Sequence, residues 1–482
     1  MNSKELEMQM LKDERVCSPE KNKSSPLDEI LSNIGFGNYQ VKAFIILGLI
    51  LINDGAEALV LSFLSAILER EWGLNSEDNG LIVSGVWLGT LIGILLSGKL
   101  GDLYGRRLPL VYASLCLYVF GVLSAYAHDF TELLILRTLY GFFMGFQYPL
   151  TITYLAEISP VNVRGKILLL CCILWTVGEL YTCFVAYFAL DNIYSGNWRS
   201  MVFWVCQPSL IGWLGAQAYL VESPRFVIVT QKNVEEGIKI LKRMAEENGR
   251  GDIIDNNAKI EIEEWSADDH STDENNIGKV STLFEPRYKK LTLLLWPIWF
   301  SLVIIYYGML YVLPLILSAL SREDSETDSS IGSVVIPVLI EIPSCVLGLS
   351  MIDREGLGRK NSMFLSFLIS AVACLFALFS DYLIFWTTIS RGLIYLALSV
   401  VYPFTVELYP TFIRATGLAY ANGCGRIGGI VMPWVVMTLY ELSPKLPFLG
   451  FSILSFAAAF LCYLIPFDTT NKELDFEMNY IV

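Results

Sequence analysis

The sequence predicts an all-α membrane protein in which twelve transmembrane helices form two pseudo-symmetric six-helix halves, with both termini in the cytosol. The first observation behind this prediction is the composition: 54% of the 482 residues are hydrophobic, 17% are charged, and the mean hydropathy is +0.51. A soluble domain carries about 25% charged residues. The second is a series of long apolar runs, and the third is a set of polar residues that recurs about 250 positions later. A duplicated helix bundle punctuated by charges is typical of two-fold transporters.

The apolar runs are each long enough to cross a bilayer. A spanning helix needs about 20 mostly apolar residues, because lipid offers its backbone no hydrogen-bond partners. In chain order the predicted spans are 43–66, 80–101, 108–127, 131–156, 167–190, 200–221, 291–319, 331–352, 362–380, 382–405, 415–440 and 448–466.

Lysine and arginine residues set the predicted orientation, because they are enriched in cytosolic loops. With both termini inside, cytosolic segments hold 27 of the 34 Lys and Arg residues. The external loops then hold only Arg70, Arg199, Arg322 and Lys445. The chain is accordingly divided into a cytosolic tail (1–42), a first half (43–221), a cytosolic connector (222–290), a second half (291–466) and a cytosolic tail (467–482).

Two pieces outside the spans have helical patterns. Residues 28–40 are expected to form a short amphipathic lead-in at the membrane face. Within the connector, the apolar residues of 234–247 recur at helical spacing, which predicts a short surface helix. Residues 251–280 are polar and are expected to be flexible.

The repeat relates polar residues in the two halves. Arg137 lies twelve positions before Pro149, and Arg391 lies twelve positions before Pro403. Two cytosolic motifs recur with them. The first runs from Glu157 to Arg164 and again from Glu407 to Arg414, and the second is Asp102 with Arg106 and Arg107, repeated as Asp353 with Arg359 and Lys360.

These duplicated cytosolic charges are predicted to form a gate. The arginines of one loop can bridge to carboxylates of the next, and such pairs can latch the two halves together. The gate candidates from the repeat are Asp102, Arg106, Arg107, Glu157, Arg164, Asp353, Arg359, Glu407 and Arg414.

Several charged residues fall inside the predicted spans, where each costs roughly 2.5–3.5 kcal/mol to insert. They are Asp54, Glu57, Arg137, Glu179, Glu341, Arg391 and Arg426. Either they form neutralising pairs that fasten helices together, or they line a polar cavity between the halves. As a set they favour the cavity, and its candidates for solute binding are Glu179, Tyr306, Tyr307, Glu341, Arg391 and Arg426.

Asp54 and Arg137 suggest a proton-coupling device. Burial disfavours a charged carboxylate, whereas a nearby guanidinium favours it. If Arg137 approaches Asp54 in one conformation only, the carboxyl binds a proton in the other. Glu57, on the same helical face, can share that proton.

Aromatic and glycine residues add weaker indications. Six aromatic residues can line a cavity, or can instead face lipid or pack in the core: Trp175, Trp296, Trp299, Tyr306, Tyr307 and Tyr311. Tyr306 and Tyr307 point to different helix faces, so only one is expected to line the path. Gly141 and Gly145 share a face, where two helices can approach closely.

The cytosolic motifs resemble those of the major facilitator superfamily. Asp102-Leu-Tyr-Gly-Arg-Arg107, Val221-Glu-Ser-Pro-Arg-Phe226 and Pro466-Phe-Asp-Thr-Thr470 are similar to signatures of its sugar-porter and organic-ion branches. Asp54-Gly-Ala-Glu57, Tyr306-Tyr-Gly308 and Glu341-Ile-Pro343 resemble the synaptic vesicle 2-related group. The resemblance implies the major facilitator fold, and it adds Glu222, Arg225 and Asp468 to the gate candidates.

The resemblance implies a secondary active transporter of a small organic solute by alternating access, and the acidic residues allow proton coupling. In organic-ion transporters that resemble this chain, the position that matches Arg426 is basic in anion carriers and acidic in cation carriers. Arg426 therefore favours an anionic or zwitterionic solute. The alternative is a vesicle-membrane protein that binds a ligand or partner without translocation.

The remaining expectations concern partners and location. The sequence contains no motif for an enzyme, a metal, a cofactor or nucleic acid, so we expect a lipid-embedded monomer whose ligands are a small solute and a proton. The plasma membrane and a vesicle or endolysosomal membrane are both open as its location.

Overall fold

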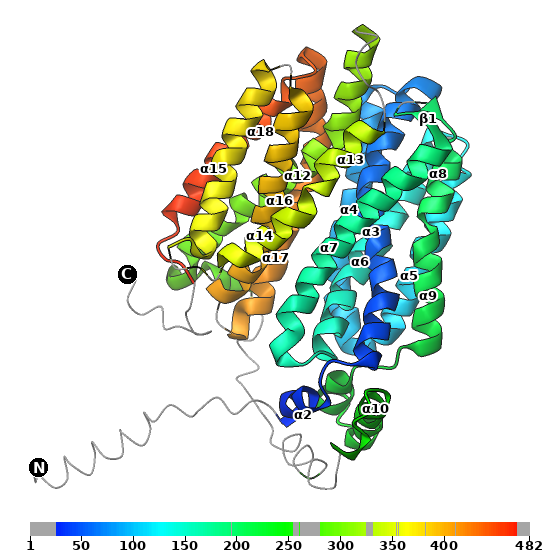
Figure 1. The fold of residues 1–482 in the computed structure, drawn as a ribbon, viewed down its shortest axis with the longest axis vertical. Coiled ribbons are helices and arrows are strands. Elements are labelled where there is room, and N and C mark those ends of the chain that lie inside the picture. The colour runs from blue at the N-terminus through cyan, green and yellow to red at the C-terminus, as the bar shows by residue number, and fades with distance from the viewer. Residues whose placement is uncertain are drawn as a thin grey trace, which may run out of the picture.

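The computed structural model describes residues 26–193, 195–253, 260, 280–323, 331–352, 354, 356–380, 382–409 and 411–469. These residues are helical apart from loops and one short antiparallel hairpin of β1 (Leu190–Asn192) and β2 (Ser195–Gly196). The long helices run side by side in two groups, and two short helices lie beneath one group (Figure 1). We call the end with these short helices the connector end and the opposite end the distal end.

The first half contains the helices that follow the short helix α2 (Pro26–Ile34). They are α3 (Asn38–Glu71), α4 (Ser76–Tyr104), α5 (Arg107–Ala125), α6 (Phe130–Glu157), α7 (Val161–Ala189), α8 (Trp198–Val205) and α9 (Gln207–Tyr219).

The connector and the second half follow in chain order. The connector contains η1 (Phe226–Thr230), α10 (Val234–Glu247), η2 (Gly251–Ile253) and η3 (Val280–Phe284). The second half contains α12 (Pro286–Glu323), α13 (Gly332–Leu339), α14 (Glu341–Ile352), α15 (Gly358–Phe379), α16 (Leu383–Leu408), α17 (Thr411–Leu442) and α18 (Pro447–Leu464).

Each predicted span corresponds to a helix or to a pair of consecutive helices. Eight described helices are long and apolar enough to cross a membrane by length and composition: α3, α4, α5, α7, α12, α15, α16 and α18. The other predicted spans correspond to α6 and α17 and to the broken pairs α8–α9 and α13–α14. The count of twelve spans and the cytosolic position of the termini stay predictions.

Polar side chains fix where several helices begin. Asn75 accepts a hydrogen bond of 2.7 Å from the backbone N–H of Asp78, and Asp129 accepts one of 2.8 Å from Glu132. Both satisfy N–H groups that have no partner within the helix. Gly105, with φ +91°, ends α4 and allows the sharp turn into α5.

Glycines let α4 and α6 approach closely, as the sequence predicted for Gly141 and Gly145. A Cβ at Gly141 would collide with the carbonyl oxygen of Val86, and one at Gly145 with that of Thr90. The two backbones are therefore in direct contact along this face.

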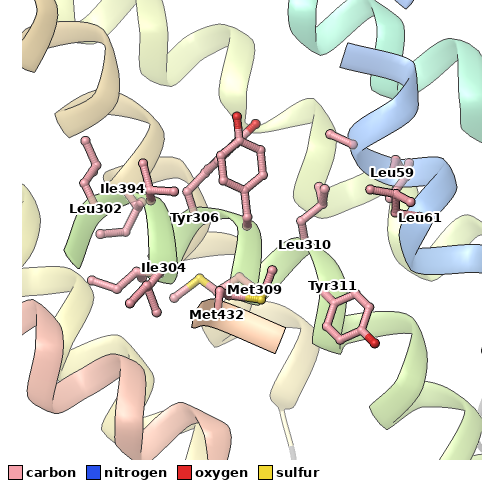
Figure 2. Close-up of a cluster of buried hydrophobic side chains, with 14 of the residues drawn as sticks. Leu59, Leu61, Leu302, Ile304, Tyr306, Met309, Leu310, Tyr311, Ile394 and Met432 are labelled. Atoms are coloured by element: carbon pink, nitrogen blue, oxygen red, sulfur yellow. The ribbon is translucent and has the colours of Figure 1, made fainter. Parts of the chain in front are cut away.

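The two halves meet in an apolar seam that reaches toward the distal end. Leu59 and Leu61 of α3 face Leu310 and Tyr311 of α12 in the buried cluster (Figure 2). Hydrogen bonds add to the seam, because Ser62 Oγ donates to the carbonyl of Leu310 at 2.6 Å. From α4, Ser84 Oγ likewise donates to the carbonyl oxygen of Ile430 in α17 at 2.7 Å.

The short helices at the connector end confirm two sequence predictions. The surface helix expected at 234–247 is α10, with the same bounds. The amphipathic lead-in is α2, whose Leu27, Ile30, Leu31 and Ile34 are buried. The lead-in breaks at Gly35, where φ is +70°, so α3 begins only at Asn38. The expected flexible stretch 251–280 lies largely outside the described residues.

Candidate functional site

Acidic residues in the middle of α3 contact two different partners on α6. Arg137 Nη1 donates to both oxygens of Glu57, at 2.6 and 2.7 Å. Gln147 Nε2 donates to Oδ1 of Asp54 at 2.9 Å. All four side chains are buried, so this polar site is enclosed within the first half.

In this conformation Arg137 pairs with Glu57, so the approach of Arg137 to Asp54 stays a prediction for the other conformation. Arg137 lies near the distal start of α6, and Glu57 lies about one turn closer to the distal end of α3 than Asp54 does. The carboxylate of Glu57 is nearer and forms the ion pair with Arg137, whereas Asp54 accepts a hydrogen bond from the amide of Gln147.

Asp54 keeps an unused acceptor. Among the described residues, its Oδ2 has no hydrogen-bond partner, and no ion pair to Asp54 is formed. A buried carboxylate with one neutral donor lacks the partners that normally stabilise a buried charge. Asp54 is thus the member of the pair that is chemically suited to take up a proton.

A second polar cluster joins the two halves at mid-height. Arg391 of α16 forms ion pairs with Glu179 of α7 and with Glu341 of α14; the bond from its Nε to Glu341 Oε1 measures 2.8 Å. Tyr306 Oη of α12 lies 2.9 Å from Glu179 Oε1 and 3.1 Å from Glu341 Oε1. One arginine thus lies between a carboxylate of the first half and one of the second.

A break in the helix places Glu341 there. Pro337 and Pro343 flank the interruption at Ile340, and Glu341 is the first residue of α14. A helix N-terminus favours a carboxylate because its free N–H groups carry partial positive charge.

This cluster corrects the prediction that its members line an open cavity. Glu179 and Glu341 are fully buried, and Arg391 is 2% exposed. Both carboxyls contact the same side chain, because a guanidinium can bond to two carboxylates at once. Both acids pair with Arg391, and among the described residues neither forms an ion pair with Arg426.

A pocket lies beside this cluster, between the halves. Its empty volume is about 590 Å³, open solvent included. The lining comes from α6, α7, α12, α16 and α17 and consists of Tyr148, Cys172, Trp175, Trp299, Val303, Tyr307, Tyr395, Leu398, Ser399, Tyr402, Asn422 and Arg426. The ring of Tyr307 in this lining lies 4.2 Å from the ring of Trp87.

Arg426 is the charged residue in this lining. Its guanidinium lies 5.3 Å from the centre of the Trp87 ring, and its side chain hydrogen-bonds Tyr307. Its Nε has no hydrogen-bond partner among the described residues. The pocket therefore presents an available cationic donor in an aromatic wall.

The predicted aromatic residues divide among four places. Trp175, Trp299 and Tyr307 line the pocket, and Tyr306 lies in the Arg391 cluster, so only one of the adjacent tyrosines lines this pocket. Trp296 stacks on Tyr420 at a ring distance of 6.4 Å. Tyr311 lies in the seam and is 2% exposed.

The gate candidates of the first half form one network at the connector end. Arg106 forms an ion pair of 3.2 Å with Glu157, as predicted. Glu222 accepts bonds from the backbone N–H groups of Arg106, Arg107 and Ser223, at 2.9, 3.2 and 2.8 Å. Burial raises the pKa of the Glu222 carboxyl despite these donors.

The second half repeats this network. Arg359 forms an ion pair of 2.7 Å with Glu407. Asp468 accepts from the backbone N–H groups of Arg359 and Lys360, at 3.2 and 3.1 Å. Asp468 thus plays the part in this half that Glu222 plays in the first.

The predicted latch across the halves is not made by these pairs, because each lies within one half. The contacts between the halves described above lie in the middle and toward the distal end. At the connector end, each charged network contacts residues of its own half. Asp353 lies outside the described residues, as do the side chains of Asp102 and Arg414.

Two gate arginines have a partner that the sequence did not indicate. Asp28 of α2 accepts from Arg164 at 3.1 Å and from Arg225 at 2.5 Å. Gln147 was missed in the same way, although a glutamine within an apolar run was a usable signal. Nothing in the sequence distinguished four other pocket residues from the remaining polar or aromatic residues of the spans: Tyr148, Tyr395, Tyr402 and Asn422.

Comparison with known proteins agrees with this arrangement. Residues 52–480 match the family "Sugar (and other) transporter". The synaptic vesicle 2-related protein of Rattus norvegicus is 30% identical, over 93% of this chain and 82% of the relative. Organic cation/carnitine transporter 7 of Arabidopsis thaliana is 28% identical, over 93% of this chain and 95% of the relative.

A solved structure shows the same fold. The inward-open conformation of the xylose transporter XylE from E. coli superposes with a TM-score of 0.73, at 19% identity, covering 90% of this chain and 98% of that one. Family and fold are those of membrane transporters rather than enzymes. The chain is therefore a multi-pass membrane protein that belongs to the sugar (and other) transporter family of the major facilitator superfamily.

Proposed function

We propose that this protein is a secondary active transporter that moves a small organic anion or zwitterion by alternating access, coupled to protons. The observation that carries the proposal is the position of Arg426 in the wall of a pocket between the halves, with an unpartnered Nε. The twelve-span topology, cytosolic termini, five-segment division and monomeric state belong to the same proposal.

The pocket supports a solute site by the chemistry of its lining, which is mostly aromatic and apolar with a few polar groups. Tyr and Trp rings give an apolar wall, and Asn422 and Ser399 add a few polar groups that can orient a solute.

The charge balance favours an anionic group on the solute. Arg426 offers a planar guanidinium, which suits a carboxylate bonded through two hydrogen bonds. Glu179 and Glu341 could hold a cation only by giving up Arg391. A zwitterion fits as well, because the tyrosine and tryptophan faces can accept a solute cation.

Proton coupling is assigned to Asp54. Its Oδ2 is buried without a partner, and its neighbour Glu57 already neutralises Arg137. Protonation of Asp54 would remove a buried charge that takes part in no ion pair among the described residues, and release would follow when water reaches α3 in the other conformation.

The relatives support a transport role and leave the solute open. One is named an organic cation/carnitine transporter, and carnitine carries a carboxylate together with its cationic group. A vesicle membrane as the location follows the name of the synaptic vesicle 2-related relatives.

The test is uptake by the purified protein in liposomes, with and without an inward proton gradient. The solutes should be matched sets that differ in charge alone, such as an aromatic carboxylate, its amide and the corresponding amine, together with carnitine. We expect saturable uptake of a carboxylate or zwitterion, driven by the gradient. Saturable binding without uptake would instead support a ligand-binding membrane protein of the same fold.

A further inference from the structure

The Arg391 cluster holds fewer protons than its contacts require. Five oxygen–oxygen contacts within hydrogen-bond distance join its members. Tyr306 Oη contacts Glu179 and Glu341 at 2.9 and 3.1 Å, and Thr176 Oγ1 contacts Glu341 Oε2 at 2.9 Å. Thr176 Oγ1 also lies 3.1 Å from Tyr395 Oη, which lies 2.7 Å from the carbonyl oxygen of Cys172.

Only three hydroxyl groups serve these five contacts, and each carries one proton. If both carboxyls are ionised, two contacts bring oxygens together with no proton between them. A proton on Oε2 of Glu341 supplies one of the two missing protons, because Glu341 then donates to Thr176, Thr176 to Tyr395, and Tyr395 to the carbonyl of Cys172. Only the contact of Tyr306 with Glu341 Oε1 is then left without a proton of its own. Tyr306 remains free to donate to Glu179.

The charge balance points to the same site. Glu179 and Glu341 are fully buried around one buried guanidinium, so two ionised carboxylates would leave one unbalanced negative charge away from water. Such a charge is costly in a protein interior. With one proton on Glu341, the ion pair of Arg391 with Glu179 balances and the cluster is neutral.

Among the described residues, Arg391 is the cation that forms ion pairs with the two carboxyls. The titratable and charged groups that face the two carboxyls are Arg391 and Tyr395 of α16, Tyr306 and Tyr307 of α12, Cys345 of α14 and Cys183 of α7.

We propose that Glu341 is a proton-binding site that is filled when α7 closes on α14 and α16 and emptied when they part. Glu179, Thr176 and Cys172 belong to α7 in the first half, whereas Glu341 and Arg391 belong to the second. Parting the halves removes the acceptor Thr176 and the competing carboxylate Glu179. Arg391 then pairs with Glu341 alone, and that carboxyl releases its proton. This rests on the alternating access of the proposed function, but not on Asp54 or on the solute.

The first experiment measures the conformational equilibrium against pH. Labels on the connector ends of α7 and α14 report their distance by double electron–electron resonance, in an Asp54→Asn background that silences the other acid. We expect the ratio of the two conformations to change by about tenfold per pH unit over the titrating range, as one bound proton requires. Glu341→Gln in the same background keeps a donor toward Thr176 and should make the ratio independent of pH, whereas exposed Glu235→Gln should not.

A second experiment requires no solute and no labels. The infrared carbonyl stretch of a protonated carboxyl should be present near neutral pH in Asp54→Asn, which removes any signal of that other buried acid, and it should disappear when Glu341→Gln is added. A pH dependence that survives Glu341→Gln, or a carboxyl band that this variant leaves intact, overturns the proposal. If solute uptake is absent but the carboxyl band behaves as expected, the proton site at Glu341 is supported and the proposed transport function is wrong.

Discussion

Gln147 donates a hydrogen bond of 2.9 Å to Asp54, and this amide, rather than a guanidinium, is the partner of the buried acid. A neutral donor stabilises either protonation state, whereas an arginine would hold the carboxylate ionised. The pairing therefore leaves Asp54 free to exchange a proton while Glu57 keeps Arg137 neutralised.

Asp54→Asn should abolish uptake driven by a proton gradient and spare exchange that does not depend on pH. The amide retains the size of the carboxyl but cannot carry the proton. Solute uptake in liposomes at several pH values measures both. If the variant shows the pH dependence of the wild type, Asp54 is not the coupling residue.

Glu57→Gln should destabilise the protein by about 3–5 kcal/mol, because it leaves the buried guanidinium of Arg137 unpaired. Adding Arg137→Gln should recover much of this loss, since both charges are then gone. Thermal unfolding in detergent compares the two variants. Equal stability of the single and double variants would show that the ion pair does not govern folding.

Arg426→Ala should weaken binding of an anionic solute by about 10–100-fold, the range of a hydrogen bond to a charged group. Arg426→Lys should weaken it less, since a lysine keeps the charge but loses the planar pair of donors. Arg426→Asp should reverse the charge preference or abolish function. The control is Arg287→Lys, a change at an exposed arginine. The prediction is wrong if the protein takes up organic cations, if Arg426→Ala leaves that uptake unchanged and if Glu179→Gln abolishes it, because the acids would then form the solute site.

Glu157→Gln and Glu407→Gln should each shift the protein toward the conformation seen here and slow exchange. In the opposite conformation we expect the network of Arg106 in one half to contact the network of Arg359 in the other. Replacing a glutamate by glutamine removes a charge from this contact and so destabilises that conformation. Solvent accessibility of the connector end reports the shift. Unchanged accessibility and exchange in both variants would count against a gate.

Glu222 should make stability depend on pH. Its pKa is raised by burial, so the native state holds the proton more tightly than the unfolded chain does. Its contribution is present at low pH and declines as pH rises from the ordinary glutamate value, about 4.3, through the raised one. Unfolding temperatures across this window should show the decline in the wild type and not in Glu222→Gln.

Much of the fold was predictable from local patterns. The surface helix α10 follows from apolar spacing alone, because half-exposed helices must alternate their faces. Helix ends were less predictable: α3 extends from Asn38 to Glu71 although its predicted span was 43–66, because polar residues can continue a helix beyond the apolar run.

The sequence by itself determined a duplicated bundle of apolar helices with charges at matching positions, because lipid permits only helices there and a duplication leaves its residues in the chain. It also identified the charged residues that lie buried within the helix bundle. Only the tertiary structure decided which charges meet. Glu57 rather than Asp54 pairs with Arg137, and Arg391 rather than Arg426 takes both buried glutamates. Helix spacing gives each side chain a face and a height, but a difference of one turn between neighbouring helices decides which carboxylate reaches a guanidinium, and that difference is set by packing.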